Sequence, residues 1–398
     1  MQHPPIPANE MERLMSLSEL DVDYTGLADN FKDLTKLAAK VAGTEMSLFN
    51  LLDSYTQWSV SAHNIELEQM PREESVCQYV VATDDDHFEV PDLSADERFK
   101  DMPYVTGDAA LRYYYGVPVQ TKEGHRIGAL CVIDVKPKEL NPEKVELLKI
   151  IADEIVNRLR AIRIIDDLKT KLVDANETKK KVAHDIRGPL GGIIGLAQVI
   201  ADQGQNNQID EVLEFINMIH KSGRSILELA DEILSADKKE LAQPDAFNLL
   251  LFKDKLEKLY KPQALNKNIN FMVNISSTTS NRPFSKNKLL QITGNLISNA
   301  LKFTPCDGKV TVDLALEITS GSDVLQIKVS DTGVGIDDEG IKSILAGAKS
   351  TTDGTVGEKG YGFGLALVKH LIDSLKGTFH IYSNPGRGAT FVVSLPQN

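Results

Sequence analysis

The sequence predicts a multidomain α+β protein: an N-terminal α/β domain, a central helical hairpin that forms a dimeric four-helix bundle, and a C-terminal α/β sandwich. Three observations support this prediction. The 398 residues suffice for two or three domains of roughly 150 residues each. The pattern changes from strand-like runs to one long helical stretch, and then to mixed strands and helices. With 42% apolar and 25% charged residues, the composition is that of a globular chain.

Charge and composition exclude several function classes. The chain has 44 basic and 57 acidic residues, a net charge of −13 that would repel nucleic acids and anionic lipids. No apolar run approaches the ~18 residues of a membrane span, and the N-terminus lacks the pattern of a secretory signal. The three cysteines, Cys77, Cys131 and Cys306, have neither disulfide nor zinc spacing. We expect a cytoplasmic protein without a nucleic-acid partner or membrane span.

The N-terminal part consists of a lead-in over 1–20, loose or with one short helix, and a domain over 21–160. An amphipathic helix is expected from Leu27 to Ala42, ended by Gly43. Five strand-like runs follow, the last two joined by a hairpin turn, over 46–53, 56–63, 87–92, 114–121 and 126–134.

The central part, 161–240, is predicted to be a helical hairpin. The helical pattern runs from Pro142 to about Ala201, and its apolar stripe needs a partner helix. A polar turn at 203–208 precedes a second helix from Ile209 to Leu234. Two such hairpins form a four-helix bundle, so we expect a homodimer.

The C-terminal part, 244–398, is predicted to be a mixed sheet with helices on one face. Helices are expected over Phe252–Tyr260 and Lys286–Lys302, and strands over 268–275, 309–318, 323–331, 377–384 and 389–396. The chain ends directly after the last strand, so we expect no further domain there.

Three polar motifs in this part carry the chemistry. Asn295, Asn299 and Lys302 fall on one helix face at i, i+4 and i+7, where an amide oxygen suits Mg²⁺ and an ammonium suits phosphate. Asp331 ends a strand, where its carboxylate can accept a hydrogen bond from an exocyclic amine, and Gly333 and Gly335 allow close backbone approach. A glycine-rich run then precedes an amphipathic helix whose free amides can hold phosphates; it contains Gly357, Gly360, Gly362 and Gly364.

The order of these motifs over 244–396 resembles the Bergerat-fold ATP-binding domain of histidine kinases. The resemblance implies that Asn299 holds Mg²⁺, Lys302 contacts phosphate and Asp331 binds the adenine amine of ATP. It extends the ATP site to Asn295, Gly333, Gly335, Gly360, Gly362, Gly364, Leu365 and Thr390. Related ATPases have Glu at the position of Asn295. Because an amide cannot act as a general base, Asn295 favours phosphoryl transfer over hydrolysis.

The stretch 182–190 resembles the phosphoacceptor box of histidine kinases. It implies that the neutral imidazole of His184 attacks the γ-phosphate and that Asp185 orients and deprotonates it. Pro189 lacks an amide, which frees a carbonyl and loosens the helix there. Many relatives carry Thr or Asn at the position of Gly188, so we predict weak or no phosphatase activity.

The segment 20–160 resembles a GAF domain. Taken together, the resemblances imply three parts: an N-terminal GAF sensor domain, a central helical hairpin and a C-terminal Bergerat-fold domain. Its ligand, a possible small molecule, is unknown. Cys77 is compatible with a linked bilin or a redox role, but core packing is favoured. The histidines His63, His87 and His125 suggest no metal set, and the tyrosines at 113–115 line a pocket or pack.

Together these features predict a GAF-containing sensor histidine kinase that phosphorylates His184 with Mg-ATP and passes the phosphoryl group to an aspartate of a separate response regulator. A change of packing in the helix over Pro142–Lys181 would carry the GAF state to His184. Two alternatives remain open: a non-catalytic nucleotide-binding regulator, and a Ser/Thr kinase or ATPase of the same nucleotide-binding fold.

Overall fold

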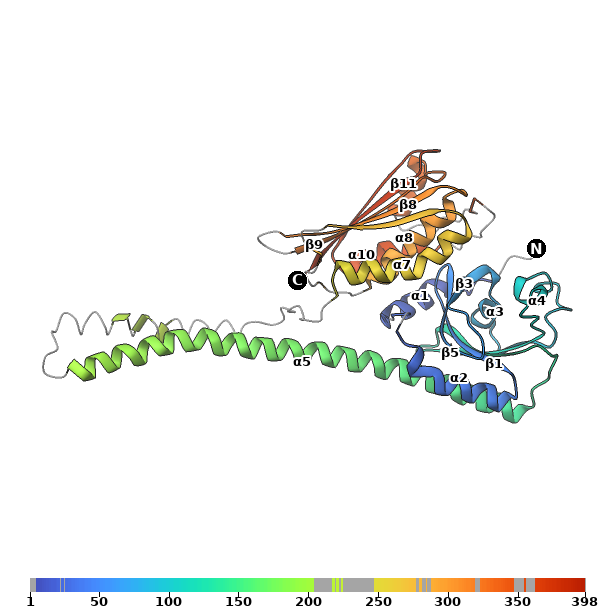
Figure 1. Ribbon diagram of the computed structural model, residues 1–398, viewed down its shortest axis with the longest axis horizontal. Helices are drawn as coiled ribbons and strands as arrows, with labels where there is room; N and C mark the ends of the chain where they lie inside the picture. The colour runs from blue at the N-terminus through green and yellow to red at the C-terminus, as the bar shows by residue number, and fades with distance from the viewer. Residues whose placement is uncertain are drawn as a thin grey trace. The chain divides into compact units, whose positions relative to one another are not determined.

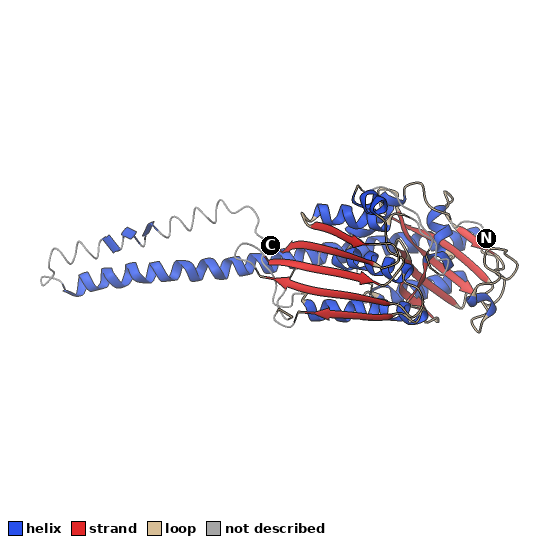
Figure 2. Cartoon of the chain, turned by 90° about the horizontal axis from the view of Figure 1, so that it is seen from above, coloured by secondary structure: helices blue, strands red, loops and turns tan. Residues whose placement is uncertain are grey.

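The computed structural model divides the chain into two units, residues 1–164 with 247–397, and residues 165–246. It describes residues 5–21, 23–24, 26–203, 217–218, 220–221, 223–224, 247–276, 279–280, 284, 288–318, 323–346, 354–355 and 362–397. Between 166 and 203 the helix is described but most of its side chains are not. Figure 1 shows the elements and Figure 2 the sheets.

The N-terminal sheet has six antiparallel strands in the order β3-β2-β1-β6-β5-β4. Apolar side chains cover both of its faces, because alternate residues of each strand point to opposite sides. Helix α2 (Ala28–Ala42) ends at Gly43, whose φ is +72°, as the sequence predicts. The strands are β1 (Met46–Leu52), β2 (Thr56–His63), β3 (Gln69–Pro71), β4 (Phe88–Val90), β5 (Tyr113–Gln120) and β6 (Arg126–Asp134). The short helices are η1 (Arg72–Glu74), α3 (Cys77–Ala82) and α4 (Pro103–Thr106).

The lead-in contains one helix, α1 (Glu10–Glu19), and this helix packs into the fold. Glu10 is fully buried between two guanidinium groups, with Arg13 Nε at 2.8 Å and Arg72 Nη1 at 2.5 Å from its carboxylate oxygens. Burial opposes ionisation of Glu10, but the charges of Arg13 and Arg72 lower its pKa to about 2. This network joins the N-terminal segment to the domain that follows.

The long predicted helix is observed as α5 (Pro142–Gln203). Its first turns bury Leu148, Ile151, Ile155 and Leu159 against the same face of the sheet as α2. Gln203, the first residue of the turn predicted at 203–208, still belongs to α5, and 204–208 lies outside the described residues. Most of the second predicted helix also lies outside them; residues 217–218, 220–221 and 223–224 are helical.

The C-terminal sheet has the order β10-β11-β9-β8-β7, in which only β7 and β8 are parallel among the described strands. Helices cover one face, as predicted, and the strands alternate between buried and more exposed residues (Figure 2). The strands are β7 (Asn270–Ile275), β8 (Lys309–Glu317), β9 (Asp323–Asp331), β10 (Thr378–Ser383) and β11 (Ala389–Gln397). The helices are α7 (Leu249–Asn266), α8 (Leu289–Phe303), α9 (Asp338–Leu345) and α10 (Gly364–Ser374).

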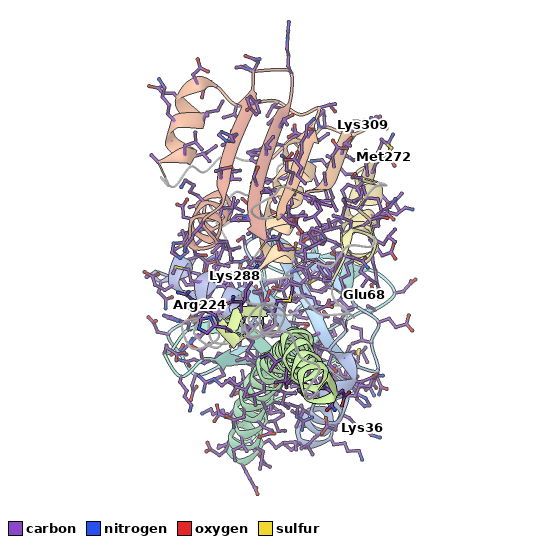
Figure 3. The ribbon with its side chains drawn as sticks, turned by 90° about the vertical axis from the view of Figure 1, so that its left-hand side faces the viewer. Lys36, Glu68, Arg224, Met272, Lys288 and Lys309 are labelled. Atoms are coloured by element: carbon purple, nitrogen blue, oxygen red, sulfur yellow. The ribbon has the colours of Figure 1, made fainter. Side chains whose placement is uncertain are left out.

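Two helix limits differ from the prediction. Helix α7 starts earlier than predicted, because Asn248 caps it by accepting a hydrogen bond from the Leu251 amide at 3.0 Å. Helix α8 starts later than predicted, because Lys288 has φ +57°, a left-handed conformation that a right-handed helix does not contain. Lys288 is labelled in Figure 3 with Met272 and Lys309 of the two parallel strands.

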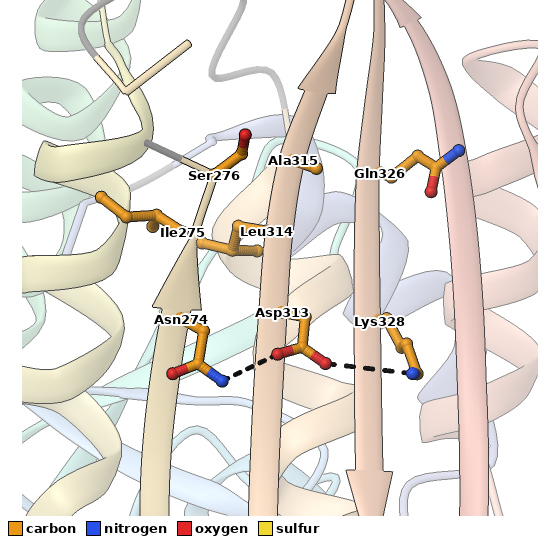
Figure 4. A pocket seen from close by; sticks show the side chains of 8 residues that line it. All are labelled: Asn274, Ile275, Ser276, Asp313, Leu314, Ala315, Gln326 and Lys328. Carbon is orange, nitrogen blue, oxygen red and sulfur yellow. Dashed lines mark hydrogen bonds and ion pairs between the residues drawn. The ribbon is translucent and has the colours of Figure 1, made fainter. Parts of the chain in front are cut away.

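The face of this sheet opposite the helices is polar. A hollow of about 290 Å³ lies over β7, β8 and β9 (Figure 4). Asp313 at its centre accepts a hydrogen bond from Asn274 at 2.8 Å and pairs with Lys328 at 4.0 Å. None of the predicted site residues lines it.

Candidate active site

Helix α8 carries the first predicted motif. Asn295, Asn299 and Lys302 are only 2%, 3% and 6% exposed, although the sequence pattern predicts a ligand-binding face. The Asn295 amide nitrogen donates to the carbonyl of Gln291 at 2.8 Å, one turn earlier. The Asn299 amide nitrogen is buried without a hydrogen-bond partner. Because an unpaired buried amide costs about 1–3 kcal/mol, Asn299 is suited to a polar ligand.

Lys302 lies at the end of the same helix. Its ammonium nitrogen is 4.9 Å from the centre of the Phe303 ring and 5.6 Å from that of Tyr55. Lys267, which follows α7, donates to the carbonyls of Leu301 at 3.0 Å and Lys302 at 2.8 Å. A cation at a helix C-terminus stabilises the last turn, so Lys267 helps to hold Lys302 in place.

Asp331 ends β9 and lies half-buried at the edge of the helical layer. Its Oδ1 accepts hydrogen bonds from the amides of Gly333 at 2.8 Å and Ala389 at 3.1 Å. Burial raises the pKa of this carboxyl, and the two backbone hydrogen bonds lower it in part. On β11, Thr390 pairs with Ser330, and their hydroxyls are 3.1 Å apart. Because neighbouring residues of a strand point to opposite faces, this contact places the Thr390 hydroxyl on the other face of the sheet from the Asp331 side chain.

The glycines after Asp331 have a packing reason within the chain. A Cβ on Gly333 would lie 2.4 Å from the carbonyl oxygen of Phe303. Gly335 has φ +74°, and a Cβ there would lie 2.1 Å from the carbonyl oxygen of Asn384. The loop is tied to the β10–β11 turn, since the Ile336 amide donates to the Ser383 hydroxyl at 2.7 Å. The packing of the chain therefore requires glycine at both positions, whether or not a ligand is bound.

The glycine-rich run is described only in part. Gly360 lies outside the described residues. Gly362 has φ +73°, Gly364 begins α10, and Leu365 packs partly buried against the core of this domain. An Asn295 oxygen lies 3.1 Å from the position of a Cβ on Gly364. The N-terminus of α10 therefore faces the asparagine-bearing side of α8, which is the arrangement expected of a phosphate site.

Two residues of the site are absent from the sequence prediction. Gly388 has φ +77°, and a Cβ there would lie 2.0 Å from the carbonyl oxygen of Asp331. Tyr55, in the turn between β1 and β2, lies against α8 and Gly364. The glycine-rich turn at 386–388 was a signal for Gly388, whereas nothing in the sequence points to Tyr55.

His184 and Asp185 lie in α5, as predicted. The structure does not describe the side chains of His184, Asp185 and Pro189. The helical backbone places the phosphoacceptor box on one continuous element with the part of α5 that packs on the N-terminal sheet.

In the N-terminal domain Cys77 is 2% exposed and packs in the apolar cluster on the α3 face of the sheet. Its sulfur is 3.9 Å from that of Cys131 and accepts a hydrogen bond from the Tyr114 hydroxyl at 3.1 Å. Burial opposes ionisation, but hydrogen bonds from Cys131, Tyr114 and Asn50 lower the pKa of Cys77 to about 7. Tyr113, Tyr114 and Tyr115 are all buried.

Two of the three histidines named in the sequence analysis, His87 and His125, have side-chain contacts within this domain. His125 lies 2.6 Å from the Ser16 hydroxyl, and His87 stacks on Tyr115. Among the described residues no group of three or more His, Cys, Asp or Glu side chains converges as a metal site. Within that same part of the chain, every helix is too short or too polar to cross a membrane.

Three family profiles match the chain in order. Residues 26–159 match the GAF domain, 180–241 the His Kinase A (phospho-acceptor) domain, and 285–398 the histidine kinase-, DNA gyrase B-, and HSP90-like ATPase. The chain therefore combines, in this order, regions that match a GAF domain, a histidine kinase phosphoacceptor domain and a histidine kinase-like ATPase domain.

Curated relatives of two different classes match parts of the chain. The chain is 35% identical over 230 residues to the autoinducer 2 sensor kinase/phosphatase LuxQ of Vibrio parahaemolyticus, covering 54% of this chain and 26% of LuxQ. A cyclic di-GMP phosphodiesterase of Pseudomonas aeruginosa is 33% identical over 164 residues, covering 41% of this chain and 28% of that protein. The chain thus spans about a quarter of the length of these relatives. Among solved structures, the catalytic domain of the histidine kinase ThkA matches 38% of this chain and 93% of its own, at 21% identity and TM-score 0.32.

Proposed function

We propose that this chain is a protein histidine kinase that binds Mg-ATP in its C-terminal domain and transfers the γ-phosphoryl group to His184. The observation that carries the proposal is the convergence of Asn295, Asn299 and the N-terminus of α10 in a domain that matches the histidine kinase ATPase family. Asp331 Oδ2 would accept a hydrogen bond from the adenine amine, while backbone amides hold Oδ1.

The residues present fit a magnesium triphosphate. Asn299 offers an amide oxygen, the kind of ligand that Mg²⁺ takes, and its unpartnered buried amide nitrogen can donate to a phosphate oxygen. Lys302 offers a cation on the same helix face. When bound, Mg²⁺ would neutralise charge on the triphosphate. Lys302 would contact a phosphate oxygen, and Gly360, Gly362 and Gly364 would surround the phosphates. Asn295 cannot accept a proton at neutral pH, so it would not activate water.

The proposed reaction is an in-line transfer. An imidazole nitrogen of His184 attacks the γ-phosphorus, the bond to the β–γ bridging oxygen breaks, and ADP leaves with that electron pair. Asp185 orients the ring and takes the imidazole proton. The phosphoramidate then passes its phosphoryl group to an aspartate carboxylate of a response regulator, which restores the imidazole. The kinase would act as a homodimer.

The test uses the whole chain with γ-labelled ATP. We expect acid-labile, base-stable label on the wild-type chain and none on His184→Gln. His380→Gln, at an exposed position on β10, is the matched control and should be labelled normally. Acid-stable label would indicate a Ser/Thr kinase, phosphate release without label an ATPase, and binding with neither a non-catalytic regulator.

We further propose that the GAF domain, with an unidentified small ligand, controls the kinase through α5. One residue inserted between Ile164 and His184 rotates the helix by about 100°, whereas seven residues restore its face to within about 20°. We expect the single insertion to change autophosphorylation and the seven-residue insertion to leave it near the wild-type level. Equal activity of all three proteins would contradict helical transmission.

A further inference from the structure

The GAF domain and the ATPase domain belong to one compact unit and share a close interface. Trp58 of β2 meets Tyr260 of α7 edge to face, with ring centres 6.0 Å apart. Gln69 of β3 donates to the carbonyl of Leu259 at 2.8 Å. Trp58 belongs to the same buried apolar cluster as the core of the ATPase domain. A contact of this kind fixes which part of the GAF domain faces the nucleotide site.

That part is the turn between β1 and β2, and it brings Tyr55 onto the site. The Tyr55 hydroxyl lies 2.9 Å, and its Cε2 2.6 Å, from the position of a Cβ on Gly364. The Lys302 ammonium is 5.6 Å from the ring centre. One tyrosine therefore lies against Lys302 and Gly364, two of the residues to which the proposed function assigns phosphate.

The turn that carries Tyr55 is held by buried groups. The Tyr55 carbonyl accepts a hydrogen bond from the Arg72 amide at 2.9 Å, and the Asp53 carbonyl accepts one from the Arg72 guanidinium at 3.2 Å. The same guanidinium pairs with buried Glu10. A ring held in this way covers the asparagines of α8 at a fixed position, which agrees with their low exposure.

From this geometry we propose that Tyr55 of the GAF domain occupies the space of the triphosphate in a closed state, so that nucleotide binding requires the GAF domain to withdraw. This inference rests on the proposed function of the site. The aromatic ring and a magnesium triphosphate compete for the space beside Lys302 and Gly364. Because only open molecules bind nucleotide, the apparent affinity is the affinity of the open state multiplied by the fraction of molecules that are open.

The test is titration of the full chain with a fluorescent ATP analogue and Mg²⁺, followed by anisotropy. Tyr55→Ala removes the ring and should bind about tenfold more tightly, if about 10% of wild-type molecules are open. Tyr382→Ala is the matched control, because Tyr382 lies 63% exposed on β10, and it should bind as the wild type does. Tyr55→Phe keeps the ring and should stay near the wild-type affinity.

A second variant tests the same idea without altering the turn. Lys255 of α7 forms an ion pair with Asp23 of the GAF side. Lys255→Glu should loosen the interface and raise the affinity, and adding Asp23→Lys should lower it again.

The outcomes separate the two proposals. If wild type and Tyr55→Ala bind equally, and Asp331→Asn weakens nucleotide binding by both, the proposal that Tyr55 covers the site is wrong and the nucleotide site stands. Failure of Tyr55→Ala and Lys255→Glu to bind at all, while both remain folded by circular dichroism, would overturn the nucleotide site together with its cover.

Discussion

The Ala389 amide donates a hydrogen bond to Asp331 Oδ1 at 3.1 Å, across 58 positions of sequence. This bond joins the start of β11 to the end of β9, and the Gly333 amide adds a second bond to the same oxygen at 2.8 Å. Two backbone amides therefore orient the carboxylate. Its second oxygen is the atom that we assign to the adenine amine.

Asp331→Asn should weaken nucleotide binding. Loss of a hydrogen bond to a charged acceptor costs about 2 kcal/mol, which is about 30-fold in affinity. Calorimetric titration with ADP measures the change. Asp313→Asn makes the same charge change on the opposite face of the sheet and should bind normally. Equal losses in the two variants would argue against a direct role of Asp331.

Nucleotide affinity should also depend on pH through Asp331. Burial raises the pKa of this carboxyl above its usual 3.8, so the acceptor is lost on acidification at a higher pH than for an exposed aspartate. The folded state holds this proton more tightly than the unfolded state. The free energy of unfolding should therefore fall as pH rises from the pKa of Asp331 in the unfolded state to its higher pKa in the folded state. Asp331→Asn should lack both effects, which ADP titrations and urea unfolding from pH 4 to 7 can establish.

Gly388→Ala should destabilise the protein more than Gly386→Ala. Both glycines have positive φ, +77° and +76°, so alanine strains the backbone about equally at the two positions. A Cβ on Gly386 meets nothing within 4 Å, whereas one on Gly388 lies 2.0 Å from the Asp331 carbonyl oxygen. We expect about 1 kcal/mol for Gly386→Ala and at least about 3 kcal/mol for Gly388→Ala by urea unfolding. Similar costs would show that the close approach is absorbed by movement of the turn.

Glu10→Gln should lower the free energy of unfolding by about 3–5 kcal/mol, because it leaves buried Arg13 and Arg72 without their carboxylate. Glu12→Gln, on the exposed side of α1, should cost far less. The pKa of Glu10 is lowered to about 2 from 4.5, so its contribution is complete above pH 4.5 and is lost as pH falls towards 2. The difference in free energy of unfolding between wild type and Glu10→Gln should therefore shrink as pH falls from 4.5 towards 2, which urea unfolding at several pH values can measure.

Gly188 should leave the protein with weak or no phosphatase activity, since glycine has no side chain to position water. When unphosphorylated protein is mixed with a phosphorylated response regulator, the amount of phosphate on the regulator should fall little or not at all, with or without ADP. Rapid ADP-stimulated loss would contradict this. The relatives named sensor kinase/phosphatase make the comparison informative, and Gly188→Asn should gain activity if the side chain is the missing part.

Local patterns were sufficient to predict most elements of both sheets and the shared helix face of Asn295, Asn299 and Lys302. Helical and strand periodicity relate residues only a few positions apart, so the apolar pattern alone specifies them. The prediction was wrong about the start of α8, because the left-handed conformation of Lys288 leaves no mark in the hydrophobic pattern.

The sequence by itself determined the order of the domains and the chemical types gathered in each motif, because both are properties of neighbouring residues. Only the tertiary structure decided that Glu10 is buried between two arginines, that Ala389 orients Asp331, and that Tyr55 lies against Lys302 and Gly364. These contacts join segments tens to hundreds of positions apart. Their partners are selected by the packing of whole sheets and helices, which no local spacing encodes.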